Sequence, residues 1–157
     1  MKTTQPLKVL MVCLGNICRS PTAEAVLRAR ARQAGVTLEV DSAGTYGGHA
    51  GATPDARSRA AGERRGYNFS GIQARQVKVE DFAKFDLVLA ADRNNLADLQ
   101  VLCPDEYQHK VKLLLSFSDT GEQEVPDPYY GGDQGFEHVL DLVESACDGI
   151  LLSLETV

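Results

Sequence analysis

Short apolar runs alternate with segments of helical periodicity along most of the chain. Four runs rich in Val and Leu predict buried parallel strands at residues 7–13, 37–42, 85–91 and 111–117. Because helix-like segments separate these runs, the pattern favours an α/β fold. Its core is expected to be one open sheet with right-handed crossovers.

The segments between and after the strands predict four helices. The first three span residues 21–33, 55–65 and 94–102. The last helix has the clearest pattern, because its apolar residues repeat at three- and four-residue steps: Phe136, Val139, Leu140, Val143, Cys147, Ile150, Leu151 and Leu154. This stripe is expected to pack against the sheet, with Cys147 as a small core residue.

Length and composition predict one globular domain covering residues 1–157, with 43% apolar and 24% charged residues. Sixteen Lys and Arg against 22 Asp and Glu leave a net charge of −6. An acidic protein repels phosphate backbones, so nucleic-acid binding is not expected. The longest early apolar run, residues 9–14, is too short to span a membrane. We therefore expect no membrane association and a cytoplasmic location.

The cysteines and histidines do not predict a metal site. The sequence has four cysteines without a Cys-x2-Cys pair, and its three histidines are scattered. No export signal is recognised, so the thiols are expected to stay reduced.

The segment after the first predicted strand carries the strongest chemical signal. Cys13 ends this strand, and the turn that follows leads into a helix, which is where open α/β sheets bind ligands. Gly15 and Asn16 accept left-handed backbone angles, so the turn can direct successive N–H groups inward. Pro21 suits a first helical turn and favours Ser20 as the N-cap. Together with the positive end of a helix, this turn predicts a cradle for one phosphate.

Two side chains give this cradle a chemistry. Arg19 presents a planar fork that can bind two phosphate oxygens at once. The helix N-terminus favours the thiolate form of Cys13, which is then a nucleophile aimed at phosphorus. Ser20 can donate a hydrogen bond to that sulfur. The competing interpretation is a tight turn with a buried cysteine, but several independent local features agree on the phosphate site.

The long acidic loop at residues 118–135 supplies a candidate acid. Asp127 lies between two prolines that restrict its backbone, and Tyr129 and Tyr130 follow with rings that can line a slot for a flat substrate. A tyrosine or alcohol leaving group needs a proton that a thiolate cannot give. Asp-Pro alone is a common turn signal. Beside a phosphate loop, the catalytic interpretation is favoured.

With these motifs, the sequence resembles the low-molecular-weight protein tyrosine phosphatases nearly from end to end. The resemblance rests on residues 12–21, 41–45, 74–76, Asp92 and 127–132. It implies a flavodoxin-like, four-stranded parallel sheet with helices on both faces, and no metal or cofactor. It also implies hydrolysis of phosphotyrosine in protein substrates through a cysteinyl-phosphate intermediate.

The resemblance assigns roles to individual residues. Cys13 is the nucleophile, Arg19 binds the phosphoryl group, and Asp127 protonates the leaving phenol and then activates water. The implied phosphate-binding residues are Leu14, Gly15, Asn16, Ile17, Cys18 and Arg19. The implied supports of the loop are Asn16, Ser20, Ser42 and Asp92, and the implied wall of the substrate pocket is Ile17, Tyr129 and Tyr130. Cys18 resembles a second cysteine that traps oxidised Cys13 as a reversible disulfide.

Three features leave alternatives open. A histidine that often braces the loop in this family is replaced by Ile72 and Gln73, so one bracing hydrogen bond lacks its expected partner. Tyr46, in a loop with four glycines, either covers the slot or lies in solvent. Asp92 either pairs with Arg19 or caps the next helix.

Three other functions are possible on such a fold. An arsenate reductase needs two further cysteines close together, whereas Cys103 and Cys147 are far apart in sequence. A protein arginine phosphatase tends to carry Thr at the position of Ile17. A non-catalytic binder of phosphate or phosphotyrosine needs neither a thiol nor an acid. The resemblance to bacterial members further implies a tyrosine autokinase as a partner, and the sequence does not predict the oligomeric state.

Overall fold

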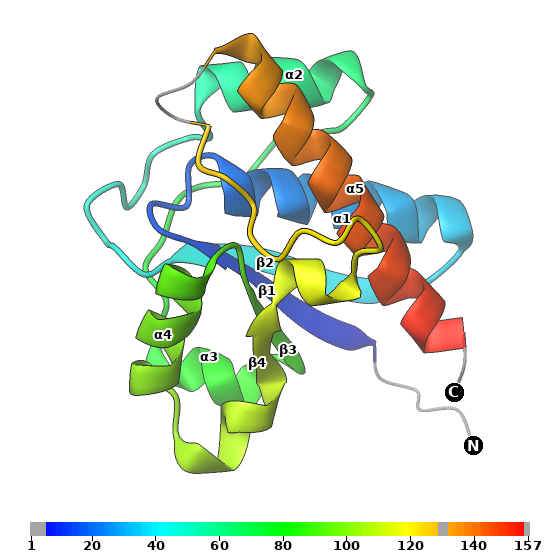
Figure 1. Cartoon of the computed structure of the whole chain (residues 1–157). Helices are drawn as coiled ribbons and strands as arrows, with labels where there is room; N and C mark the ends of the chain where they lie inside the picture. Colours follow the sequence, from blue (N-terminus) through cyan, green and yellow to red (C-terminus); the bar gives the residue numbers. More distant parts are fainter. Residues whose placement is uncertain (1–5, 129–131, 156–157) are drawn as a thin grey trace.

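The structure, a computed structural model, describes residues 6–128 and 132–155. Its centre is a parallel sheet of four strands in the order β2-β1-β3-β4 (Figure 1). The strands are β1 (Leu7–Cys13), β2 (Leu38–Gly44), β3 (Leu87–Ala90) and β4 (Val111–Leu113). The central strands β1 and β3 are buried along most of their length, as a sheet covered on both faces requires. The predicted four-stranded parallel sheet is therefore confirmed.

The register of the strands creates a common edge. Cys13 at the end of β1 pairs with Gly44 of β2, and Val12 pairs with both Ala43 of β2 and Ala90 of β3. The carboxyl ends of these three strands therefore meet, which is where open α/β sheets bind ligands.

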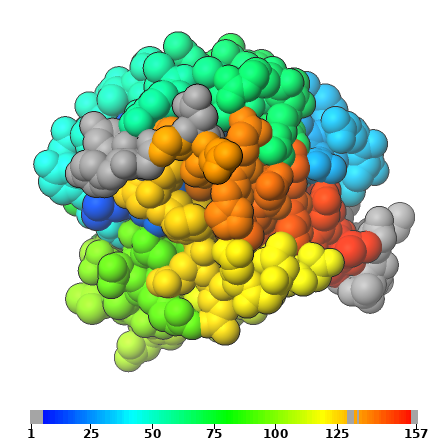
Figure 2. All heavy atoms as spheres, turned by 45° about the horizontal axis from the view of Figure 1, so that its top comes forward, coloured from blue at the N-terminus to red at the C-terminus, as the bar shows by residue number. Residues whose placement is uncertain are grey.

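Helices cover both faces of the sheet. One face carries α1 (Arg19–Ala34), α2 (Ala56–Arg64) and α5 (Asp133–Glu155), and the other carries α3 (Val79–Lys84) and α4 (Arg93–Leu102) (Figure 1). Side chains of β1 alternate between the two cores, with Val9 and Met11 on the α1 side and Leu10 and Val12 on the α4 side. In the space-filling view, α5, in orange and red, lies on one surface beside the yellow residues that come before residue 129 (Figure 2).

The apolar stripe of the 23-residue helix α5 is buried as predicted. Val143, Cys147 and Ile150 are fully buried against α1 and the sheet. On another side of α5, Glu137 and Glu144 pair with Arg65 beside α2. Among the described helices, α5 included, none is long and apolar enough to cross a membrane.

The fourth strand is shorter than the predicted 111–117. It ends at Leu113, and the chain continues as a 3₁₀ helix, Leu114–Phe117. Leu114 and Leu115 are both buried in the core on the α5 side. Neighbouring residues of a strand would point to opposite faces, so the turn is what allows both leucines to enter one core.

The third strand begins later than the predicted residue 85, because Phe85 ends a helix that the sequence pattern did not reveal. This helix, α3, has only six residues, too few to show a clear apolar period. Asp81 accepts a hydrogen bond from the backbone N–H of Lys78 (2.8 Å) and stabilises the first turn of α3.

The first helix begins one residue before the predicted N-cap. Cys18 occupies the N-cap position of α1 without a capping side-chain bond, and Ser20 is the second residue of the helix. The prediction of Ser20 as the N-cap is wrong, because its hydroxyl bonds within the turn rather than to the helix backbone.

Candidate active site

The turn between β1 and α1 wraps around the side chain of Cys13. The sulfur accepts a hydrogen bond from the backbone N–H of Asn16 (3.3 Å) and lies 3.0 Å from the hydroxyl oxygen of Ser20. The helix α1 begins directly after this turn, so its first N–H groups and its partial positive charge lie close to the sulfur. The arrangement favours a negative charge at this position.

Asn16 holds the winding of the turn. It is the one non-glycine residue with a positive φ (59°) in the described part of the chain, a conformation that costs about 1–3 kcal/mol. Its buried amide offsets this strain, because Nδ2 donates to Ser20 (2.8 Å) and Oδ1 accepts from the backbone N–H of Arg75 (3.0 Å). Gly15, by contrast, has no positive φ, but a Cβ there would lie 2.8 Å from the ring of His49, which would have to shift.

Arg19 is fixed beside the sulfur by two acceptors. Its Nη1 donates to Oδ2 of Asp92 (2.7 Å) and to the carbonyl oxygen of Val125 (3.0 Å). Burial alone would lower the pKa of Arg19, but the charges of Cys13 and Asp92 outweigh it and raise the pKa. The other carboxylate oxygen of Asp92 accepts from the N–H of Asn95 (2.8 Å) at the start of α4. Asp92 therefore both pairs with Arg19 and caps α4, the two roles that the sequence left open.

Asp127 reaches the site because the loop before it is tied to the sheet. The N–H of Val125 donates to the carbonyl of Ala91, just after β3 (2.8 Å), while the carbonyl of Val125 accepts from Arg19. Two residues later, Oδ2 of Asp127 lies 3.9 Å from Nη2 of Arg19, and the Asp127 side chain is 42% exposed. The carboxylate therefore lies at the mouth of the site.

A pocket of about 360 Å³ opens above the sulfur. It is lined by Cys13, Leu14, Gly15, Ile17, Cys18, Arg19, Tyr46, His49 and Asp127. The rings of Tyr46 and His49 meet edge to face with centroids 5.8 Å apart. Tyr46 also fills the space that a side chain at Gly48 would take. The structure therefore places Tyr46 on the wall of the pocket, although the residue is 55% exposed.

The hydroxyl of Ser42 bonds to a helix residue rather than to the phosphate loop, which corrects the expected role. Its hydroxyl donates to Oε1 of Glu24 in α1 (2.6 Å), and its backbone N–H donates to Asp41 (2.8 Å). The physical reason is that Glu24 is a buried carboxylate that needs donors, and Ser42 supplies one. Within the turn, Asn16 and Ser20 bond to each other instead.

Cys18 lies in the same turn as Cys13, and its side chain is buried. Burial, reinforced by the charges of Asp55 and Cys13, raises the pKa of Cys18 to about 12, although a hydrogen bond with Ser58 lowers it. Cys18 is therefore a protonated thiol at neutral pH.

The sequence of the chain matches one known family over almost its whole length. Residues 8–157 match the family described as low molecular weight phosphotyrosine protein phosphatase. The chain belongs to this family. A putative low molecular weight protein-tyrosine-phosphatase of Synechocystis is 49% identical over 152 residues, which cover 94% of this chain and 96% of that protein. The low molecular weight protein-tyrosine-phosphatase of Streptomyces coelicolor is 46% identical over 153 residues, covering 94% and 93%.

Solved structures confirm the fold of this phosphatase. The crystal structure of a protein tyrosine phosphatase from Entamoeba histolytica, with Hepes in the active site, matches with a TM-score of 0.92 and 42% identity. The match covers 96% of this chain and 97% of that chain. The predicted α/β fold class with helices on both faces is thus confirmed.

The two remaining cysteines of the phosphatase lie on opposite faces of the sheet. Cys103 belongs to the core on the α4 side and Cys147 to the core on the α5 side. Burial raises the pKa of both thiols. An arsenate reductase relay needs two such thiols close to each other, so this placement argues against it. Within the residues described, no group of three or more His, Cys, Asp or Glu side chains could hold a metal ion.

Some site residues were missed or cannot be placed. Tyr129 and Tyr130, the predicted aromatic wall, lie outside the described residues. Sequence reasoning missed Val125 and gave Arg75, within the motif 74–76, no role in the loop, because both contribute backbone groups there, which any residue type supplies. The N–H of Arg75 braces the loop by donating to Oδ1 of Asn16. His49 was also missed, and the glycines before it were the only signal.

Proposed function

We propose that this phosphatase hydrolyses phosphotyrosine in protein substrates through a cysteinyl-phosphate intermediate. The observation that carries the proposal is the sulfur of Cys13 in a pocket that Arg19 and Asp127 also line. The relatives from Synechocystis and Streptomyces coelicolor, both named protein-tyrosine-phosphatases, support the substrate class.

In the first step, the backbone N–H groups of residues 14–19 and the guanidinium of Arg19 bind the phosphate oxygens. The thiolate of Cys13 attacks phosphorus, and the bond between phosphorus and the tyrosyl oxygen breaks. Asp127, at the mouth of the pocket, gives its proton to that oxygen as it leaves. Arg19 stabilises the charge that develops on the phosphoryl oxygens.

In the second step, the carboxylate of Asp127 takes a proton from water, and the water oxygen attacks phosphorus. The bond between sulfur and phosphorus breaks, and its electron pair returns to Cys13 as the thiolate. Ser20, whose hydroxyl lies 3.0 Å from the sulfur, donates a hydrogen bond to this leaving thiolate. Inorganic phosphate leaves, and Asp127 is protonated for the next cycle.

The pocket walls suit an aryl group. Leu14, Ile17 and Tyr46 border the opening above the sulfur, so a phenyl ring bound there would contact apolar surface on more than one side. A phosphoserine side chain would leave these surfaces uncovered. By resemblance, Tyr129 and Tyr130 belong to the same wall.

The proposal is tested by hydrolysis of matched phosphopeptides that carry phosphotyrosine, phosphoserine, phosphothreonine or phosphoarginine. We expect the wild-type protein to hydrolyse the phosphotyrosine peptide fastest. Cys13→Ser should abolish turnover and retain affinity for inorganic phosphate, since the backbone cradle and Arg19 remain. Faster release from phosphoarginine would instead indicate an arginine phosphatase. Phosphate binding without turnover in the wild type would indicate a binding protein.

We also propose that peroxide inactivates the enzyme reversibly through Cys18, in accord with the resemblance. Peroxide converts the thiolate of Cys13 to a sulfenic acid and is reduced to hydroxide. The thiolate of Cys18 then attacks the oxidised sulfur, and the hydroxyl leaves as water after taking up a proton. Because the pKa of Cys18 is about 12, its thiolate is scarce at neutral pH, and disulfide formation should accelerate as pH rises toward that value.

Ser58 offers a matched test of this redox step, since its hydrogen bond lowers the pKa of Cys18. Ser58→Ala should slow disulfide formation without changing the rate at which peroxide removes activity. Both rates are measured by quenching with a thiol reagent and counting free thiols by mass spectrometry. Full recovery of Cys18→Ser under a reductant after peroxide would contradict the protective disulfide.

For the cellular setting, we propose a bacterial tyrosine autokinase as the substrate, the cytoplasm as the location and a single domain over residues 1–157. The resemblance to bacterial phosphatases supports this setting. Cys13→Ser should retain an autophosphorylated tyrosine kinase on a column and release it with free phosphate. A kinase that passes through unretained would contradict the proposed partner.

A further inference from the structure

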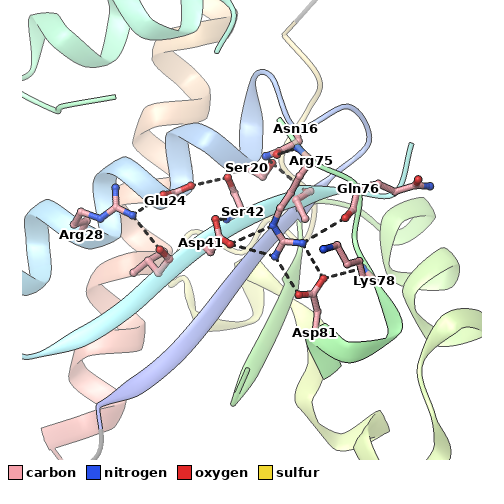
Figure 3. A network of polar contacts seen from close by, with 12 residues as sticks. Asn16, Ser20, Glu24, Arg28, Asp41, Ser42, Arg75, Gln76, Lys78 and Asp81 are labelled. Atoms are coloured by element: carbon pink, nitrogen blue, oxygen red, sulfur yellow. Dashed lines mark hydrogen bonds and ion pairs between the residues drawn. The ribbon is translucent and has the colours of Figure 1, made fainter. Parts of the chain in front are cut away.

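Arg75 joins the phosphate loop to the edge strand β2 through its backbone. The N–H of Gly44 donates to the carbonyl of Arg75 (2.8 Å), and the N–H of Arg75 donates to Oδ1 of Asn16 (3.0 Å). From Asn16 the bonds continue through Nδ2 to Ser20 (2.8 Å) and through the backbone N–H to the sulfur of Cys13 (3.3 Å). A continuous line of hydrogen bonds thus runs from β2 to the proposed nucleophile, and Figure 3 shows Arg75, Asn16 and Ser20 within it.

The side chain of Arg75 is held by two carboxylates. Its Nη1 and Nη2 donate to the two oxygens of Asp81 (3.0 and 3.1 Å), and its Nε donates to Asp41 (3.2 Å). The Asp81 side chain is only 9% exposed and also accepts from the N–H of Lys78 (2.8 Å). The guanidinium therefore bridges β2, which carries Asp41, and α3, which carries Asp81 (Figure 3).

The backbone around Arg75 is already attached to its surroundings without this side chain. The N–H of Gly51 donates to the carbonyl of Ala74, and the N–H of Ala74 donates to the carbonyl of Ala52, both at 2.8 Å. The segment therefore has attachments to the fold that do not involve the ion pairs. What a bidentate arginine adds is orientation. Here it fixes the peptide whose N–H meets Asn16.

We propose that Arg75, held by Asp41 and Asp81, is a positioning residue for the nucleophile. Its N–H orients the side-chain amide of Asn16, the residue with the strained positive φ of the loop. Through the bonds of Asn16 to Ser20 and to the sulfur, it fixes the position of the Cys13 sulfur. The inference rests on the proposed function, because the positioned group is the proposed nucleophile. It adds a determinant of catalysis that lies outside the loop and the pocket.

The test uses Arg75→Met, which keeps the backbone N–H and an unbranched side chain but removes the bonds to both carboxylates. We expect kcat/KM for an aryl phosphate to fall about tenfold, since a small misplacement of a reacting group has effects of this order. The same substitution is then made in an Asn16→Gly background. Glycine keeps the positive φ without strain and has no side-chain amide for Arg75 to orient. There Arg75→Met should change kcat/KM by less than about twofold.

Arg64→Met is the matched control. It is the same substitution, and it breaks an exposed ion pair with Glu137 (2.9 Å) between α2 and α5, away from the loop. It should leave kcat/KM unchanged in both backgrounds. A loss from Arg75→Met that is as large with Asn16→Gly as without it would overturn the proposal, as would no loss at all.

A second measurement does not depend on turnover. Inorganic phosphate should protect Cys13 from alkylation by iodoacetate, and Arg75→Met should raise the phosphate concentration needed, but not in the Asn16→Gly background. If this pattern holds while no phosphomonoester is hydrolysed, the proposed function fails and the positioning role stands. If turnover is present and the pattern is missing, the positioning role alone fails. Should Arg75→Met not fold, Asp41→Asn removes one partner and carries the same test.

Discussion

The proposed nucleophile and the proposed general acid differ sharply in exposure. Cys13 is 2% exposed at the base of the pocket, and the side chain of Asp127 is 42% exposed at its mouth. This difference suits their proposed roles, because a nucleophile shielded from water keeps its charge unsolvated. A general acid that later activates water must instead be in contact with it.

Asp127→Ala tests this division of labour. For phenyl phosphate, whose leaving group needs a proton, we expect turnover to fall by about 10²–10⁴-fold. For p-nitrophenyl phosphate, whose leaving group departs readily as an anion, the loss should be far smaller. The measurement is kcat for a series of aryl phosphates of graded leaving-group acidity. Asp98→Ala, at an exposed carboxylate on α4, is the control and should leave the series unchanged. Equal losses across the series would exclude Asp127 as the acid.

Side chains with a chemical requirement could be predicted, and backbone partners could not. A thiol, a guanidinium and a carboxylate have few substitutes, so Cys13, Arg19 and Asp127 were recognisable, and the structure brings them to one pocket. The left-handed residue Asn16 is confirmed for the same reason, since few residue types tolerate that conformation. Val125 escaped prediction because its contribution is one N–H and one carbonyl.

At the scale of elements, length decided what the sequence pattern could show. The helix α5 was predictable, because its apolar stripe repeats over many turns. The six-residue α3 and the three-residue β4 contain less than two full turns and two full pleats. Their boundaries depend on long-range contacts, such as the packing of Leu114 and Leu115 into one core. The apolar pattern within a short segment does not predict those contacts.

The junction of α1 and β2 is where a buried charge affects stability. Glu24 of α1 is 5% exposed and bonds to Ser42 of β2 and to Arg28. Burial raises the pKa of Glu24, although the bonds from Ser42 and Arg28 lower it. The native state therefore holds this proton to a higher pH than the unfolded chain does. As pH rises above about 4.3, the ordinary value for Glu, the free energy of unfolding should fall on account of this group.

Glu24→Gln removes the ionisation and gives the prediction its measurement. The free energy of unfolding of the wild type minus that of Glu24→Gln should decrease as pH rises from about 4 to 7. Urea denaturation at each pH measures both free energies. Glu39→Gln, at an exposed position of β2, should show no such decrease. A difference that stays constant or grows with pH would mean that the bonds to the carboxylate outweigh its burial.

At the scale of the whole molecule, the pocket that contains Arg19 belongs to an acidic protein. Arg19 and the N-terminus of α1 favour an anion in this pocket, yet the chain as a whole has a net charge of −6. The phosphate group of a substrate meets Arg19 and the N-terminus of α1, and the flanks of a peptide substrate meet the net negative charge of the whole chain. We therefore expect substrate choice beyond the phosphotyrosine to depend on charge that is spread over the surface.

This difference in scale predicts a salt-dependent preference for phosphotyrosine peptides with basic flanks. A chain of this length has a radius of gyration of about 15 Å. The Debye length is about 30 Å at 0.01 M salt, so the net charge of the whole molecule acts on an approaching peptide, and about 3 Å at 1 M, where only contacts remain. We expect kcat/KM for a Lys-flanked peptide to exceed that for a Glu-flanked peptide several-fold at the lower salt concentration, and the two values to converge at the higher. Phenyl phosphate, which has no flanks, should show no comparable change. A preference that persists at 1 M salt would place the selection in a direct contact at the mouth of the pocket. At that salt concentration the net charge is screened and cannot distinguish two peptides that differ only in their flanks.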